Sequence, residues 1–213
     1  MRLIIRQTKI FINSAILFFI IIGCSSFNSK ESEILAMPLS LNIERFDLQF
    51  HQSQSADIPV LKNNYPFLFP KKFHDSVWVK RQKDSLQLLL LENVEKSFPS
   101  MDPLEEELEY LFKHLKYYFP RTRTPRVIGV INNVDYQSKT IYNDSLLLIS
   151  LDTYLGKNHP LYEGIPQYIR QEMDAKFLSS HVVNKFAEYK IPPPNGRSFL
   201  SMMVYEGKKI YLK

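Results

Sequence analysis

The only cysteine of the chain lies in a pattern that favours covalent lipidation. Cys24 follows Ile21, Ile22 and Gly23, so two aliphatic residues and one small residue precede the thiol. This order is typical of a bacterial lipobox, in which the thiol accepts a diacylglycerol, a peptidase cuts before the cysteine, and the new amino group is acylated. Several acyl chains, at about 0.8 kcal/mol per buried methylene, form a stable membrane anchor. We therefore predict signal cleavage between Gly23 and Cys24 and lipidation at Cys24.

The residues before Cys24 have the organisation of a secretory leader. Residues 1–23 begin with three cations and continue into the apolar run 10–22, which is shorter than the roughly 20 residues that a membrane span needs. A plain signal anchor with an incidental cysteine is the alternative, which the position of the single cysteine disfavours. Residues 24–38 begin with a polar stretch and are expected to form a flexible tether. Ser25 after the cysteine favours the outer membrane, whereas the charges of Lys30, Glu31 and Glu33 faintly resemble a surface-export signal. We expect an envelope protein anchored in the outer membrane and facing the periplasm, with the leaflet and the side of the membrane left open.

The five histidines do not have the spacing of a zinc site. A zinc-peptidase helix needs two histidines one turn apart and a glutamate beside the first. At His181 the next residue is a valine, and Lys185 stands where the second histidine would fall. A glycine-rich phosphate loop and a Gly-x-Ser-x-Gly nucleophile motif are also absent from the sequence. We therefore expect no cofactor, no catalytic residue and no enzymatic activity.

Two clusters of charge are expected to be solvated rather than functional. Glu105, Glu106 and Glu107 complement the positive end of a helix dipole. The basic loop 121–126 could meet an anionic lipid, a glycan or an acidic partner, but exposed arginines of this kind are mostly solvated. The net charge of +5 falls to +2 when the three cations of the leader are set aside, so we expect no nucleic-acid partner.

The elements that must position these residues indicate an α+β fold, mainly helical. Apolar runs separated by turn residues predict a small three-stranded antiparallel sheet over 126–152, with residues 146–149 as its central, covered strand. Both the strand and the helix periods fit residues 41–50 in part, so their type stays open. Capping residues and helical spacing predict helices over the following ranges: from Asp75 or Asp84 to 96, 102–119, 166–178, 180–189 and 198–212.

A turn after the central strand is the predicted functional loop. Asp152, Tyr154 and Gly156 follow the apolar run directly, and loops at strand ends carry function more often than strands do. The last predicted helix reaches Lys213 without a cap. We therefore expect a single α+β domain over 39–213 that is incomplete at its C-terminus.

Five phrases of the chain, in their order, resemble one family. They are Ile43-Glu44-Arg45-Phe46-Asp47, Tyr117-Tyr118-Phe119-Pro120, Ser150-Leu151-Asp152-Thr153-Tyr154-Leu155-Gly156, Gly164-Ile165-Pro166-Gln167-Tyr168-Ile169 and Tyr205-Glu206-Gly207-Lys208-Lys209-Ile210-Tyr211-Leu212. Together they resemble the gliding-motility lipoprotein B family (GldB). The resemblance implies a lipid-anchored protein that gliding requires, with links to gliding and secretion machinery proteins. The family is also distantly similar to zinc peptidases, which implies a degenerate peptidase scaffold with Glu206 as a vestigial ligand.

Three hypotheses for the function follow. The first is a non-enzymatic, lipid-anchored component of the gliding or secretion machinery. The second is a zinc-dependent, peptidase-like hydrolase, for which Glu206-Gly207 is the main support. The third is a general envelope-assembly lipoprotein whose loss disturbs motility indirectly.

Overall fold

A computed structural model describes residues 30–196 and 198–212 of the chain. Their contacts divide them into two compact units. The first consists of residues 30–40 and 109–122, and the second consists of residues 41–108, 123–196 and 198–212. Cys24 and Gly23, the residues predicted for lipidation and cleavage, lie outside the described residues.

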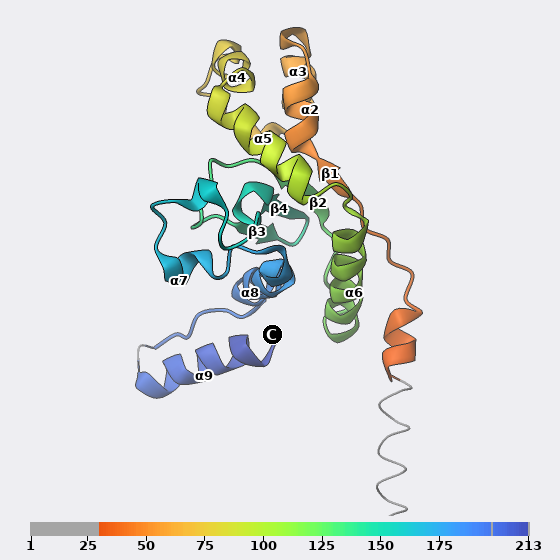
Figure 1. Cartoon of the computed structure of the whole chain (residues 1–213). Coiled ribbons are helices and arrows are strands. Elements are labelled where there is room, and N and C mark those ends of the chain that lie inside the picture. Colours follow the sequence, from red (N-terminus) through yellow and green to blue (C-terminus); the bar gives the residue numbers. More distant parts are fainter. Residues whose placement is uncertain (1–29, 197, 213) are drawn as a thin grey trace, which may run out of the picture. The chain divides into compact units, whose positions relative to one another are not determined.

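The second unit contains a mixed four-stranded sheet in the order β1-β2-β4-β3 (Figure 1). The strands are β1 (Ile43–Arg45), β2 (Arg126–Val130), β3 (Thr140–Asn143) and β4 (Leu146–Ser150). β1 and β4 both run parallel to β2, and only β3 is antiparallel to its neighbour β4. The α+β class is confirmed, whereas the prediction of a purely antiparallel three-stranded sheet was wrong.

Burial explains why the sheet departs from a simple meander. Leu147 and Ile149 of β4 are completely buried, as predicted for the central strand, and Ile128 of β2 is equally buried. β3 instead alternates between buried and exposed residues, which is the pattern of a sheet edge. After β3 the chain therefore turns back through a hairpin, so that β4 lies between β2 and β3. In this position both apolar faces of β4 are covered.

Different groups cover the two faces of this sheet. On one face, Ile128, Val130, Leu146 and Leu148 pack against an aromatic cluster, in which Phe69 and Trp78 lie with their ring centroids 4.8 Å apart. The residues that form the cluster's aromatic part are Phe46, Phe50, Tyr65, Phe69 and Trp78. On the other face, Tyr142 of β3 pairs with Leu147, and its ring lies 5.6 Å from that of Phe186 on the helix α8 (Leu178–Lys190).

The remaining helices are mostly short (Figure 1). The α-helices besides α8 are α2 (Phe46–Gln52), α3 (Ile58–Asn64), α4 (Asp75–Gln82), α5 (Ser85–Ser97), α6 (Asp102–Tyr118), α7 (Gln167–Arg170) and α9 (Phe199–Tyr211). The 3-10 helices are η1 (Ser55–Asp57), η2 (Pro66–Leu68), η3 (Leu151–Thr153), η4 (Pro160–Tyr162) and η5 (Ala175–Phe177).

Local signals predicted most helix boundaries but not all of them. Helices begin at Asp75 and just after Asp84, and the Asp84 carboxylate caps α5 by accepting the backbone N–H of Leu86 at 3.0 Å. The single helix predicted over 166–178 was wrong, because the chain forms α7, interrupts the helix, and continues as η5. The interruption lets Asp174 form an isolated antiparallel bridge with Leu155. Residues 41–50 contain both a strand, β1, and most of a helix, α2.

In the first unit, residues 30–35 are helical, although they lie in the stretch that was expected to be an unstructured tether. Ile34 on this segment is 2% exposed. The Glu31 carboxylate lies 3.0 Å from the hydroxyl of Tyr110 and 3.2 Å from Nε2 of His114, both on α6. The segment is therefore held by a buried aliphatic side chain and by polar contacts with α6.

Candidate functional site

Asp152, the first residue of the predicted functional turn, is a buried structural carboxylate. It lies in η3, directly after β4, and is completely buried. Its Oδ2 accepts the backbone N–H of Asn132 at 3.0 Å and that of Val134 at 2.7 Å. Burial raises the pKa of Asp152 to about 6, although the two backbone N–H groups act in the opposite direction. Asp152 therefore holds the loop between β2 and β3 instead of presenting a carboxylate to solvent.

The rest of the turn positions a histidine. Tyr154 is 2% exposed, and its hydroxyl lies 2.9 Å from Nδ1 of His181 on α8. Burial raises the pKa of the Tyr154 hydroxyl, so it stays protonated. Gly156 has a φ of 108°, in the region that glycine adopts without strain, and its N–H donates to the carbonyl of Met173 at 3.0 Å. The turn is thus tied to the segment at Met173 through Gly156, and to the His181 ring through Tyr154.

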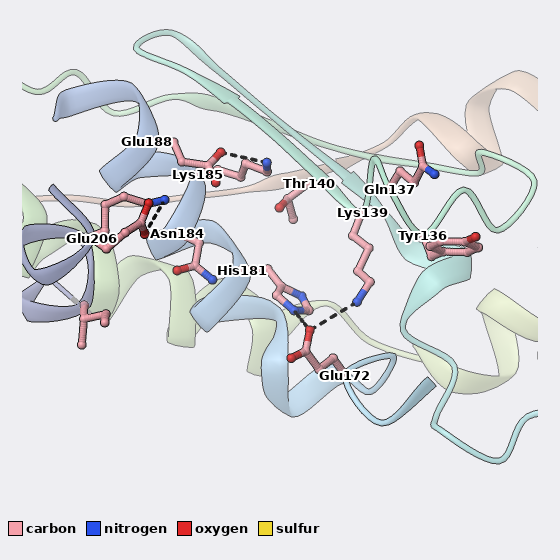
Figure 2. Close-up of a pocket in the computed structure, with 12 residues that line it drawn as sticks. Tyr136, Gln137, Lys139, Thr140, Glu172, His181, Asn184, Lys185, Glu188 and Glu206 are labelled. Atoms are coloured by element: carbon pink, nitrogen blue, oxygen red, sulfur yellow. Dashed lines mark hydrogen bonds and ion pairs between the residues drawn. The ribbon is translucent and has the colours of Figure 1, made fainter. Parts of the chain in front are cut away.

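His181 lines a cavity of about 370 Å³ (Figure 2). Charged and polar side chains from the β2–β3 loop, β3, α8, α9 and the segment after α7 surround it. The lining residues are Tyr136, Gln137, Lys139, Thr140, Glu172, His181, Asn184, Lys185, Glu188, Glu206, Lys209 and Ile210. Folding therefore brings two residues considered from the sequence, His181 and Glu206, to one cavity.

Glu172 contacts both His181 and Lys139, two side chains of this cavity with little exposure. Its Oε2 lies 3.5 Å from Nε2 of His181 and 3.8 Å from Nζ of Lys139, as the dashed lines of Figure 2 show. The Lys139 side chain is only 12% exposed, and burial lowers the pKa of its amine while Glu172 opposes this shift. This trio can hold a polar group by hydrogen bonds and can pass a proton between nitrogen and carboxylate.

The other charged residues of the cavity are paired with each other. Nζ of Lys185 lies 2.9 Å from Oε2 of Glu188 (Figure 2), and Nζ of Lys209 lies 3.2 Å from Oε2 of Glu206. Because these lysines are each paired with a carboxylate, the cavity suits a neutral or zwitterionic polar group better than a strongly charged one.

The described residues contain no group of three histidine, cysteine or carboxylate side chains placed to hold a metal ion. At the cavity, Lys185 occupies the position of the second histidine of a zinc-peptidase helix, and the Glu206 carboxylate is paired with Lys209. The role of Glu206 as a vestigial ligand stays a prediction. Lys139 and Glu172 were not predicted as site residues, because neither belongs to a motif and only folding brings the end of the β2–β3 loop to the segment after α7.

No helix in the described part of the chain combines the length and the apolar composition needed to cross a bilayer. Searches of curated proteins and of solved structures found no match to the chain. The model of one protein family, described as gliding motility protein GldB, matches residues 27–213. This match covers most of the chain and begins three residues after Cys24. The chain belongs to the gliding motility protein GldB family.

Proposed function

We propose that this protein is a lipid-anchored lipoprotein of the bacterial envelope and that the cell requires it for gliding motility. In this proposal it is a non-enzymatic component that works with other proteins of the gliding and secretion machinery. The observation that carries the proposal is the family match over residues 27–213, which follows directly on the lipobox Ile21-Ile22-Gly23-Cys24. The anchor would attach the protein to the outer membrane, with its folded part in the periplasm.

The cavity around His181 supports a binding role rather than a catalytic one. Its carboxylates are engaged in ion pairs with Lys139, Lys185 and Lys209. A general base or a nucleophile needs a neighbour that activates it, whereas each carboxylate of this cavity contacts a lysine amine. We therefore assign the cavity to the recognition of a polar group on a partner protein.

The test is complementation of a strain that lacks the gene. Three versions are introduced: the intact gene, Cys24→Ala, and the matched control Ser25→Ala, which changes the next residue and leaves the thiol. Gliding of single cells on glass is measured, together with incorporation of labelled palmitate and the amount of protein in the membrane fraction. We expect the intact gene and Ser25→Ala to restore gliding, and Cys24→Ala to lose both the label and the restoration.

Two results would contradict the proposal. Normal gliding of the deletion strain would show that motility does not need the protein. Restoration of gliding by unlabelled Cys24→Ala protein would remove the lipid anchor from the mechanism. If the deletion strain instead loses gliding together with resistance to detergents, the general envelope-assembly function replaces the specific one.

A further inference from the structure

A second cavity, of about 130 Å³, lies in the second unit and shares no residue with the first. By liquid volume it has room for about four water molecules or for one small organic molecule. Its walls come from α2, η2, α4, α5 and the end of β2. The lining residues are Phe46, Asp47, Phe50, His51, Leu68, Phe69, Trp78, Arg81, Gln87, Val130, Ile131 and Asn132.

The walls of this cavity are preformed. Gln82 at the end of α4 donates to the carbonyl of Phe50 at 2.7 Å and to Oγ of Ser53 at 2.7 Å, which joins α4 to α2. The Phe46 and Phe50 rings stack with centroids 5.6 Å apart. Most of the lining is therefore a preformed apolar surface, so little conformational entropy of the lining would be lost when a ligand binds.

Two polar atoms of the lining residues are buried without a partner. They are Nε1 of Trp78 and Nε2 of His51, and Trp78 is only 8% exposed. Nδ1 of His51 lies 2.9 Å from the carbonyl oxygen of Asp47, so this nitrogen carries a proton and donates. In the neutral ring Nε2 is therefore an acceptor, whereas the indole N–H of Trp78 is a donor. Buried polar groups are normally hydrogen-bonded, so each of these atoms indicates a missing partner.

Arg81 adds a positive charge to the same lining. It follows Trp78 by three residues on α4, so the two side chains share one face of the helix. Nε of Arg81 lies 3.4 Å from the amide oxygen of Gln87, and within the described ranges its guanidinium forms no salt bridge.

Neither Asp47 nor Asp152, the two carboxylates near Arg81, is paired with it. Asp47 also lines the cavity, but its oxygens accept from Arg45 at 2.7 to 3.1 Å. Asp152 is influenced by the charge of Arg81, but its Oδ2 accepts from backbone N–H groups and its Oδ1 is buried without a hydrogen-bond partner. The terminal nitrogens of Arg81 therefore remain available to an acceptor from outside the chain, and a guanidinium fits a carboxylate with two parallel hydrogen bonds.

We propose that this cavity binds a small organic acid that has an apolar body and one hydroxyl group. Arg81 and Trp78 donate hydrogen bonds to the carboxylate, and Nε2 of His51 accepts a hydrogen bond from the hydroxyl group. The apolar body lies against Phe46, Phe50 and Phe69. The assignment does not depend on the role in gliding, because it rests only on the cavity and its unpartnered polar atoms.

The sole tryptophan of the chain makes the test direct, because Trp78 lines the cavity and its emission responds to what lies beside the indole. The full chain, purified in detergent, is titrated to 50 mM with 2-hydroxyisovalerate, with isovalerate, and with 2-hydroxyisovaleramide. The second probe removes the hydroxyl and the third replaces the carboxylate by a neutral amide. We expect saturable changes for both acids, with affinity about fivefold weaker without the hydroxyl and at least tenfold weaker for the amide.

Two variants of α4 complete the test. Arg81→Gln and Lys80→Gln each remove one positive charge, but Lys80 is exposed and lies outside the cavity lining. We expect at least tenfold weaker binding of 2-hydroxyisovalerate for Arg81→Gln and unchanged binding for Lys80→Gln. If Arg81→Gln fails to fold, the wild-type titrations with the three probes still test the proposal. No saturable change with either acid, or equal affinity for acid and amide, overturns the proposal and leaves the cavity to water.

Discussion

The Asp152 carboxylate holds Val134 in a left-handed conformation: its Oδ2 accepts the Val134 N–H at 2.7 Å, and Val134 has a φ of 56°. A β-branched residue is strongly disfavoured in this region, and the preceding residue, Asn133, has a φ of 55° as well. A buried charge at the end of β4 therefore compensates backbone strain in the loop that leads to β3. Strain of this kind persists only where the surrounding structure imposes it.

The hydrogen bonds from the backbone N–H groups of Asn132 and Val134 to the Asp152 carboxylate form a clamp on this loop. The clamp can be tested by removing the carboxylate. Asp152→Ala leaves two backbone N–H groups without an acceptor, so we expect the free energy of unfolding at pH 7 to fall by about 2–4 kcal/mol. The control is Asp135→Ala, because Asp135 accepts a single N–H, from Gln137 at 3.0 Å, in an exposed contact. That change is expected to cost about 1 kcal/mol or less. Urea denaturation measures both, and equal losses would contradict the clamp.

The raised pKa of Asp152 predicts a dependence of stability on pH. Its folded-state pKa of about 6 lies above its ordinary value of 3.8, so the folded state holds the proton more tightly than the unfolded state. The stabilisation is fully present below about pH 4 and is lost as the pH rises through 6. We expect wild type to lose about 2–3 kcal/mol, relative to Asp152→Asn, between pH 4 and pH 7. Parallel curves for the two proteins would contradict the shift.

Gly129 is the point of closest approach between β2 and η3. A Cβ added there would lie 2.7 Å from Cδ1 of Leu151, which is completely buried. We expect Gly129→Ala to lower the free energy of unfolding by about 1–3 kcal/mol through overpacking. Gly207→Ala is the control, because open space surrounds that position on α9. It should change stability by no more than about 1 kcal/mol, in the stabilising direction, and a loss there would contradict the steric explanation.

The contact between Tyr154 and His181 can be measured by a double-mutant cycle. Tyr154→Phe and His181→Ala each remove one side of the 2.9 Å contact. We expect a coupling energy of about 1 kcal/mol in the unfolding free energy, which is typical of a partly buried hydrogen bond. The exposed pair Lys185 and Glu188, 2.9 Å apart, serves as the reference with about 0.5 kcal/mol or less. A coupling near zero for the first pair would show that the turn does not position His181.

Local patterns in the sequence predicted the elements whose stability is local. Asp84 caps α5 because a carboxylate at that position reaches the first free N–H groups of the helix. The apolar run of β4 predicted a central strand because both of its faces need cover, and Leu147 and Ile149 are completely buried. In each case the decisive interaction lies within a few residues or follows from hydrophobicity alone.

Pairings between distant segments could not be predicted in this way. β1 pairs with β2 through Ile43 and Val127, far apart in the sequence, so nothing local to β1 indicates its partner. The break between α7 and η5 likewise depends on the bridge from Leu155 to Asp174. Such contacts are chosen by the packing of the whole unit, because many weak burial terms decide between arrangements with similar local structure.

The candidate site shows the same division. The turn with Asp152, Tyr154 and Gly156 was predicted as functional from its place after a strand, but its residues are mainly structural, and Tyr154 contacts His181, which lines the cavity. Lys139 and Glu172 belong to no motif, and folding alone brings them to His181.

The sequence by itself determined the lipobox at Cys24, most of the helix ends, the central strand and the family, because each depends on residue types at short spacing. Only the tertiary structure decided the mixed sheet order, the clamp on Val134 and the two cavities. The physical reason is that the role of a buried carboxylate or an unpartnered indole depends on its neighbours, which come from distant parts of the chain. Those neighbours are set by burial and packing over the whole unit.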